Sequence, residues 1–208
     1  MQRAARRPLV FGYWVCIVVA VAVVIRRLLA LAYPPRSAPP QLADLDAVFA
    51  SHAALTLAHI LPALAFVLLS PFVVLRRPSV NVAERLLFPL GLVVGVTAYA
   101  MSVHAVGGWL ERSAVLLFNS LFLVSLFRAY LHSRRDEFAL ARQWTVRAVV
   151  ILLGIATTRP VMGVFFATSR FTGLTPEQFF GIAFWIGFSI NTITAELWLR
   201  SGRRKLAM

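Results

Sequence analysis

Three ionisable side chains lie in segments that are otherwise apolar, and they come from separate parts of the chain: His59, His104 and Arg159. Burying a charge away from water is costly, so such residues often mark a functional site. An arginine in this setting can bind an anion or the propionate of a cofactor, and two histidines can ligate haem iron. The alternative is structural: neutral histidines bonded to carbonyl groups or waters, and an arginine that snorkels or pairs within the protein.

The spacing of the other residue types predicts no reaction. The chain has no Walker A, Gly-x-Gly-x-x-Gly, His-Glu-x-x-His or Gly-x-Ser-x-Gly motif. Its single cysteine, Cys16, cannot form an internal disulfide or a cysteine-based metal site, and a transition-metal site would need a third ligand beside the two histidines. We therefore predict no catalytic residue, no metal site and no resident cofactor, with haem as the alternative that the histidines leave open.

A second group of residues is expected at the opposite boundary of the apolar segments. Arg147 and Glu196 lie at similar depths near the ends of their segments, so we predict that they form a structural ion pair. Trp144 and Trp198 flank this pair, and we predict that they anchor their helices at a membrane interface, where tryptophan is enriched.

The chain that carries these residues is too apolar for a water-soluble domain. Its 208 residues are 60% hydrophobic and only 14% charged, and the mean hydropathy is +0.78. Soluble domains are close to half apolar and about one quarter charged. The net charge of +13 does not predict a nucleic-acid partner, because nucleic-acid binding needs a solvated basic face. The composition predicts a multi-pass membrane protein whose main partner is the lipid bilayer.

Six apolar runs are long enough to cross a bilayer as helices, which takes about 17 to 25 residues. They predict one all-α membrane domain over residues 1–208, with spans at about 9–25 (extending as far as 32), 53–75, 86–106, 114–131, 146–166 and 179–199. The proline-rich segment from Tyr33 to about His52 predicts an extended loop, and Pro160 predicts a kink in the fifth span. Gly91 and Gly95 permit close helix packing, within the chain or in a homodimer.

The distribution of positive charge predicts the orientation. One side of the membrane collects 15 Lys and Arg residues and the other side five, which puts both termini in the cytoplasm of a cell whose plasma membrane (the inner membrane in bacteria) holds the protein. His59, His104 and Arg159 then share the outer half of the bilayer. Arg26 and Arg27 follow the first span on that side, where we expect them to snorkel to the interface. They also favour a retained first helix over a cleaved signal peptide.

Several short motifs follow one another in a distinctive order. They are His59-Ile60, Leu68-Leu69-Ser70-Pro71-Phe72, Arg76-Arg77, Arg142-Gln143-Trp144-Thr145-Val146-Arg147, Thr158-Arg159, Phe184-Trp185, Asn191 and Ala195-Glu196. This order resembles a family of predicted bacterial membrane proteins, the domain of unknown function 2306 family, over about residues 53–200. The resemblance implies a multi-pass helical membrane protein and no established activity. The chain lacks two cytoplasmic-side histidines of the family pattern, in segment 81–85 and at Ala141, so we do not expect a function that rests on those histidines.

Three classes of function are compatible with these residues. The first, favoured by the lack of catalytic motifs, is a non-enzymatic membrane protein with an accessory or structural role. The second is a binding or redox module that holds haem, quinone or another ligand in an outer-half pocket near His59, His104 and Arg159. The third is a small transporter, which the lack of an internal repeat and of an acidic residue near the bilayer centre disfavours.

Overall fold

The backbone is helical through almost all of the chain that the structure describes. The computed structural model describes the backbone of residues 2–33, 40–74 and 82–204, and the side chains of residues 8–33, 45–74 and 85–201. The helices of these residues are, in chain order, α1 (Gln2–Ala32), α2 (Pro40–Ser51), α3 (Ala53–Val74), α4 (Val82–Ser102), α5 (Gly108–Arg134), α6 (Phe138–Leu152), α7 (Gly154–Thr172) and α8 (Pro176–Arg204).

Within the described residues, six stretches of helix are long and apolar enough to cross a membrane, as the sequence predicts. They are Pro8–Ala32, Ala53–Val74, Arg85–Ser102, Gly108–Arg134, Phe138–Thr172 and Pro176–Ser201. The largest difference from the prediction is in the fifth stretch, which begins at Phe138 and ends at Thr172, well outside the predicted 146–166. The connection between the third and fourth stretches is also shorter than predicted, because α4 ends at Ser102 and α5 begins at Gly108. Gly108 has a φ of +58°, which a residue without a Cβ adopts readily, so the chain reverses in a short turn.

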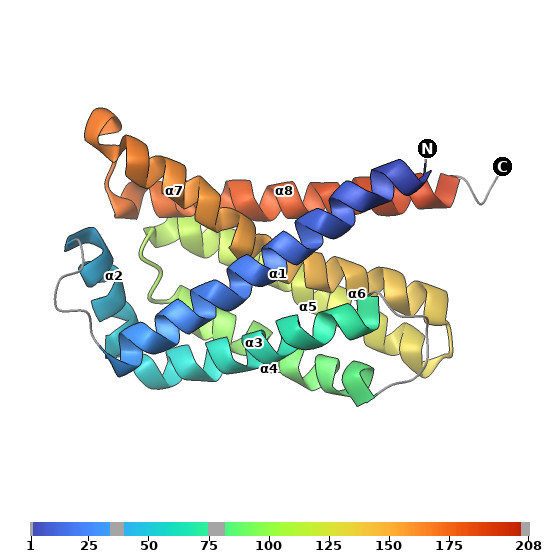
Figure 1. Cartoon of the computed structure of the whole chain (residues 1–208). Helices are drawn as coiled ribbons and strands as arrows, with labels where there is room; N and C mark the ends of the chain where they lie inside the picture. Colours follow the sequence, from blue (N-terminus) through green and yellow to red (C-terminus); the bar gives the residue numbers. More distant parts are fainter. Residues whose placement is uncertain (1, 34–39, 75–81, 205–208) are drawn as a thin grey trace.

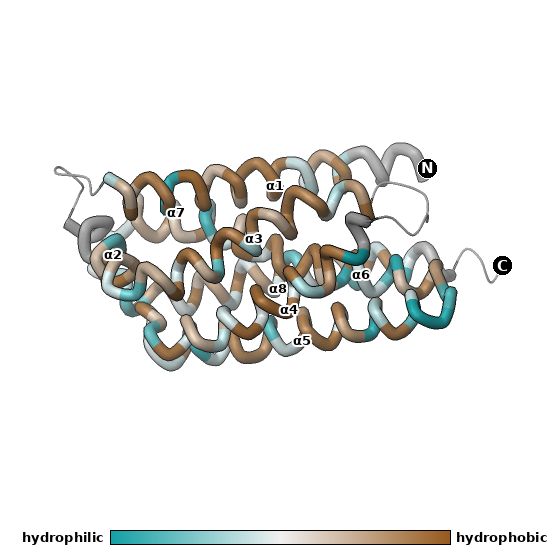
Figure 2. The backbone as a smooth tube through the Cα atoms, turned by 90° about the horizontal axis from the view of Figure 1, so that it is seen from below, coloured by the Kyte–Doolittle hydropathy of each residue, from teal (hydrophilic) through white to brown (hydrophobic). Residues whose placement is uncertain are grey.

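The helices form an elongated bundle (Figure 1). Helix α3 packs on α4, α5 on α6 and α7 on α8, and α1 crosses over α3 and α7. Helix α1 begins and α8 ends at one end of the bundle, whereas α2 and the α4–α5 and α7–α8 turns lie at the other. Apolar residues dominate the middle of the bundle and polar residues gather toward its ends (Figure 2). This banding is expected of helices that cross a bilayer, whose hydrocarbon core favours apolar side chains.

The fifth span consists of two helices, because the helix is interrupted between α6 and α7. Gly154 begins α7 and lies so close to Phe188 of α8 that a Cβ atom there would stand 2.5 Å from the ring atom Cδ1. The Val150 carbonyl accepts a hydrogen bond from Asn191 Nδ2 at 3.1 Å, so the interruption does not leave this group unpaired in an apolar environment. The sequence places a kink at Pro160, but the interruption lies earlier and Pro160 is inside α7.

The proline-rich segment contains a helix, which corrects the prediction of an extended loop throughout. Helix α2 begins at Pro40, and proline is favoured in the first helical turn. Its Asp46 carboxylate accepts hydrogen bonds from the Nη1 and Nη2 atoms of Arg26, at 3.2 and 3.0 Å, and from Nη1 of Arg27 at 2.5 Å. The sequence predicts that these two arginines snorkel to the interface, but in the structure both pair with Asp46. The physical reason is that charged groups leaving water need partners, and α2 brings one.

The two glycines of α4 serve packing within the chain. Both are buried, and a Cβ atom at Gly91 would lie 2.6 Å from Leu126 Cδ2 of α5 and 3.0 Å from Phe66 Cε2 of α3. Gly95 packs in the same way against Leu123 of α5. The small residues thus allow α4 to approach α3 and α5 closely, and their face is already covered by the protein itself.

Candidate ligand-binding site

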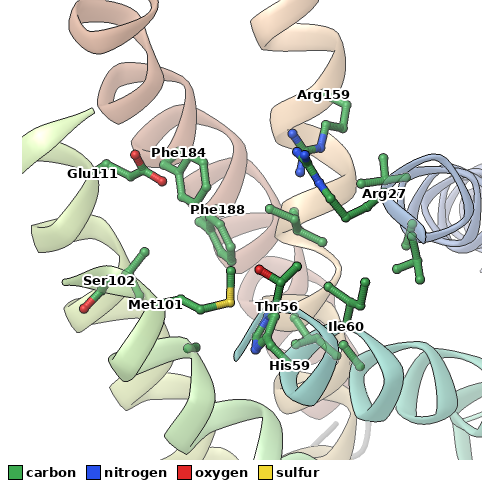
Figure 3. A pocket seen from close by; sticks show the side chains of 18 of the residues that line it. Arg27, Thr56, His59, Ile60, Met101, Ser102, Glu111, Arg159, Phe184 and Phe188 are labelled. Atoms are coloured by element: carbon green, nitrogen blue, oxygen red, sulfur yellow. The ribbon is translucent and has the colours of Figure 1, made fainter. Parts of the chain in front are cut away.

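A cavity of about 460 Å³ lies among the helices, toward the end of the bundle where α2 lies. Residues of all eight described helices line it, and most of their side chains are apolar. Its volume falls in the range of roughly 300–1,000 Å³ that is typical of small-molecule sites. Figure 3 shows that charged and polar side chains from α1, α3, α5 and α7 point into this space.

The three ionisable residues singled out in the sequence all line this one cavity: His59 from α3, His104 from the turn after α4, and Arg159 from α7. Each comes from a different place in the chain, so only the packing of the bundle brings them to a common space. They enter it differently, because His59 and Arg159 are partly buried whereas His104 is exposed at the rim.

Arg159 is held by few interactions inside the protein. One guanidinium nitrogen, Nη1, donates to the sulfur of Met162 at 3.6 Å, which is a weak acceptor. Its Nε is buried and has no hydrogen-bond partner among the described residues. A buried donor without a partner costs about 1–3 kcal/mol, so this side chain keeps hydrogen-bonding capacity that the described residues do not use.

Other charged groups surround Arg159 without neutralising it. Arg26, Arg27 and Glu111 are the charged groups that interact with it electrostatically, and no carboxylate of the described residues lies within 4.0 Å of its guanidinium. Figure 3 shows the side chains of Arg27 and Arg159 pointing toward one another, with Glu111 on the opposite side in this view. Asp46 is already shared by Arg26 and Arg27.

The neighbours of Arg159 have structural partners of their own. The carboxylate of Glu111 accepts a hydrogen bond from the backbone N–H of Gly107 at 2.6 Å, in the turn that leads into α5. Arg27 lies over the ring of Phe49, with its Cζ atom 3.8 Å from the ring centroid, and its side chain is only 14% exposed. These contacts fix the two charges in place, so the electrostatic field around Arg159 is preorganised.

The histidines make contacts of two kinds. The Nδ1 atom of His59 hydrogen-bonds Thr97 Oγ1 of α4 at 3.0 Å. His104 instead stacks on His52, with ring centroids 3.8 Å apart, where α2, α3 and the α4–α5 turn meet. Among the described residues, no group of three or more His, Cys, Asp or Glu is arranged to hold a metal ion.

The second predicted group of residues lies at the other end of the bundle. Arg147 and Glu196 form an ion pair there, through the Nε and Nη2 atoms of the arginine. The guanidinium of Arg147 also lies over the ring of Trp144, 4.5 Å from its centroid, and Trp198 is 41% exposed. The anchoring role of the two tryptophans at an interface stays a prediction.

Sequence reasoning missed three residues of the site: Arg27, Asp46 and Glu111. Arg27 was read as an interfacial residue and Asp46 as part of a loop, because nothing in the local pattern indicates that a helix folds back onto α1. Glu111 offered a clearer signal. It lies three residues after Gly108, in the first turn of α5, and an acidic residue in the first turn of a helix is favoured by the helix dipole.

The fold and the six apolar spans define a multi-pass helical membrane protein. The chain belongs to the family described as predicted membrane protein (DUF2306), whose model matches residues 56–199. The matched region extends from α3 to α8 and includes His59, His104 and Arg159. No curated protein and no solved structure matches the chain.

Proposed function

We propose that this membrane protein binds a small, largely apolar molecule in the cavity. The observation that supports the proposal is the cavity itself, with about 460 Å³ of space among eight helices. Protein interiors are close-packed, with few voids larger than a water molecule, so a space of this size calls for an occupant. Its lining includes the aromatic rings of Phe118, Phe122 and Phe184, which would contact an apolar ligand.

The distribution of positive charge supports an outward-facing cavity. The sequence collects 15 Lys and Arg residues on one side of the membrane and five on the other, and the positive-inside rule assigns the richer side to the cytoplasm. The termini belong to that side, and the cavity lies toward the opposite end of the bundle. The protein would then sit in the plasma membrane, with the cavity accessible from the outer leaflet or the outer water.

The hydroxyl groups in the cavity favour binding over catalysis. Thr56 Oγ1 donates to the carbonyl of Phe49 at 3.1 Å, and Ser102 Oγ donates to the carbonyl of Tyr99 at 2.7 Å. A hydroxyl nucleophile needs an adjacent base that takes its proton, and these two protons are directed to backbone oxygens instead. The cavity thus offers shape and fixed charge rather than an activated nucleophile.

The proposal is tested with a neutral apolar probe and a pair of matched substitutions on α4. We would measure saturable binding of radiolabelled hexadecanol to the detergent-purified protein by scintillation proximity. Ala98 lines the cavity, whereas Ala100 is exposed on the same helix and does not line it. Ala98→Trp should fill the space and reduce the affinity at least about tenfold, a change of about 1.4 kcal/mol, and Ala100→Trp should leave it unchanged.

Two results would overturn this function. One is the absence of saturable binding to the folded protein, and the other is an equal loss of affinity in both alanine variants. Far-UV circular dichroism of each variant keeps misfolding separate from a filled cavity.

Haem binding is a more specific form of the proposed function, and His59 is the residue that would ligate the iron. With Nδ1 bonded to Thr97, the other ring nitrogen is the one that could reach an iron, as in other proteins where a second-shell hydrogen bond orients a ligating histidine. An absorption spectrum of protein expressed with haem available, before and after reduction, tests this. A Soret band that shifts on reduction and disappears in His59→Ala would support haem, and a colourless protein would remove it.

A further inference from the structure

We infer that the molecule bound in the cavity is a single-chain amphipath with one negative charge, of the long-chain carboxylate type, and that its head group binds Arg159. This inference rests on the proposed function and adds the chemical class of the ligand. Two independent features of the structure lead to it: the balance of charge around Arg159 and the unpaired hydrogen-bonding capacity of its side chain.

The charges around the cavity do not balance. Three guanidinium groups, those of Arg26, Arg27 and Arg159, interact with one another electrostatically. Among the side chains that the structure describes, two carboxyl groups accompany them: Asp46, which both α1 arginines bind, and Glu111. Within this described set, one positive charge is therefore left without a counter-charge. Arg159 has no ion pair in the set and is largely shielded from water, a setting in which uncompensated charge is most costly. A ligand with a single negative charge restores the balance.

The hydrogen bonds of Arg159 point to the same kind of ligand. A guanidinium group carries five N–H donors in a planar fork, which a carboxylate can engage with two parallel hydrogen bonds. In the described part of the chain, this fork donates to the sulfur of Met162 alone, and Nε has no partner there. The side chain lines the cavity and points into it (Figure 3), so a carboxylate bound there would lie beside a guanidinium group whose donors are mostly unused.

The rest of the lining fits one hydrocarbon chain. The side chains toward the middle of the bundle are apolar and include Val67, Phe122 and Ile151. The cavity volume of about 460 Å³ is at the small end of the range for small-molecule sites, which suits one chain better than the two chains of a phospholipid. A carboxylate at Arg159 with its chain directed past these residues would use both parts of the lining.

The decisive experiment compares ligands that share a chain and differ in the head group. Binding of radiolabelled hexadecanoate to the detergent-purified protein would be measured by scintillation proximity and competed with unlabelled hexadecanoate, hexadecanol or dioctanoyl phosphatidylglycerol. We expect hexadecanoate to bind at least about tenfold more tightly than hexadecanol, because a hydrogen bond to a charged group is worth about 1.5–3 kcal/mol. Phosphatidylglycerol, with its anionic head and two chains, should compete poorly.

Substitutions of two arginines on α7 attribute this preference to one side chain. Arg159→Met should abolish the preference for the carboxylate while hexadecanol still binds, and Arg159→Lys should restore part of it. Arg170 lies on the same helix, is exposed and does not line the cavity. Arg170→Met is therefore the matched control and should retain the full preference.

The outcomes separate this inference from the proposed function. If hexadecanol binds as tightly as hexadecanoate, or if Arg159→Met keeps the preference, the cavity binds an apolar ligand and the inference of a carboxylate is wrong. If phosphatidylglycerol displaces hexadecanoate at lower concentration than hexadecanoate itself does, the ligand is an anionic phospholipid and the single-chain inference is wrong. If neither hexadecanol nor hexadecanoate binds to the folded protein, the proposed function fails as well.

Discussion

Replacing Arg159 by methionine should make the ligand-free protein more stable. Buried ionic groups exchanged for apolar groups of similar volume often leave stability unchanged or raise it by about 1–4 kcal/mol. Here the exchange removes a guanidinium whose Nε has no partner among the residues that the structure describes and which interacts with two further arginines. Methionine is unbranched and flexible, so it can occupy the space of the arginine side chain without strain. Because Arg159 is partly exposed to the cavity, we expect the lower part of this range, a gain of about 1–2 kcal/mol.

The comparison variant is Arg27→Met, which removes the same charge with the opposite expected result. Arg27 donates to Asp46 at 2.5 Å, and its side chain is only 14% exposed. Its loss leaves Asp46 with Arg26 alone, whose side chain is 49% exposed. Removing one partner of a buried, hydrogen-bonded charge pair costs about 2–5 kcal/mol, so we expect a loss of about 2 kcal/mol.

The free energy of unfolding of both variants would be measured by titration with SDS in mixed micelles, followed by far-UV circular dichroism. A saturating ligand adds to stability by mass action, about 2.7 kcal/mol at one hundred times the dissociation constant. With hexadecanoate, the native protein should therefore overtake Arg159→Met, which gains little. A loss of stability in ligand-free Arg159→Met as large as that in Arg27→Met would refute the reasoning, because Arg159 would then have a stabilising partner within the protein.

Three further predictions concern the packing and the charge pairs. Gly187→Ala should lower the free energy of unfolding by about 1–3 kcal/mol, because its Cβ atom would lie 2.7 Å from a backbone nitrogen of α7. Gly12→Ala, whose Cβ atom would have nothing within 4 Å, should raise it by up to about 1 kcal/mol. Thermal unfolding in detergent compares the two, and equal effects would contradict the close approach of α7 and α8. Asp46→Asn should release α2 and raise the rate of amide hydrogen exchange in this helix by about tenfold or more, because a lost charge partner costs at least about 1.4 kcal/mol. An unchanged exchange rate would show that apolar packing holds α2 instead. Arg147→Met should lower the free energy of unfolding by about 1 kcal/mol. The loss is modest because its partner Glu196 is 31% exposed and also lies near a second arginine. SDS titration would detect this loss, and an unchanged free energy of unfolding would show that the ion pair contributes nothing to stability.

The sequence by itself determined the class of protein and the number of spans. An apolar run of sufficient length has no stable place except the bilayer core or a protein interior, so composition and run length alone predict six spans, and the structure has six within the described residues. The sequence alone also places His59 and Arg159 within those spans. A charged or polar residue in an apolar run stands out without any knowledge of its neighbours.

The tertiary structure decided what those residues meet. Helix α2 folds back so that Asp46 binds two arginines of α1, a pairing that no local pattern encodes because it depends on how two helices pack. The interruption of the fifth span lies beside Gly154, where Phe188 of α8 approaches, and not at Pro160. The facing of each helix is set by contacts between residues far apart in the chain. Only those contacts bring His59, His104 and Arg159 to one cavity, and they leave the Nε atom of Arg159 without a partner among the described residues.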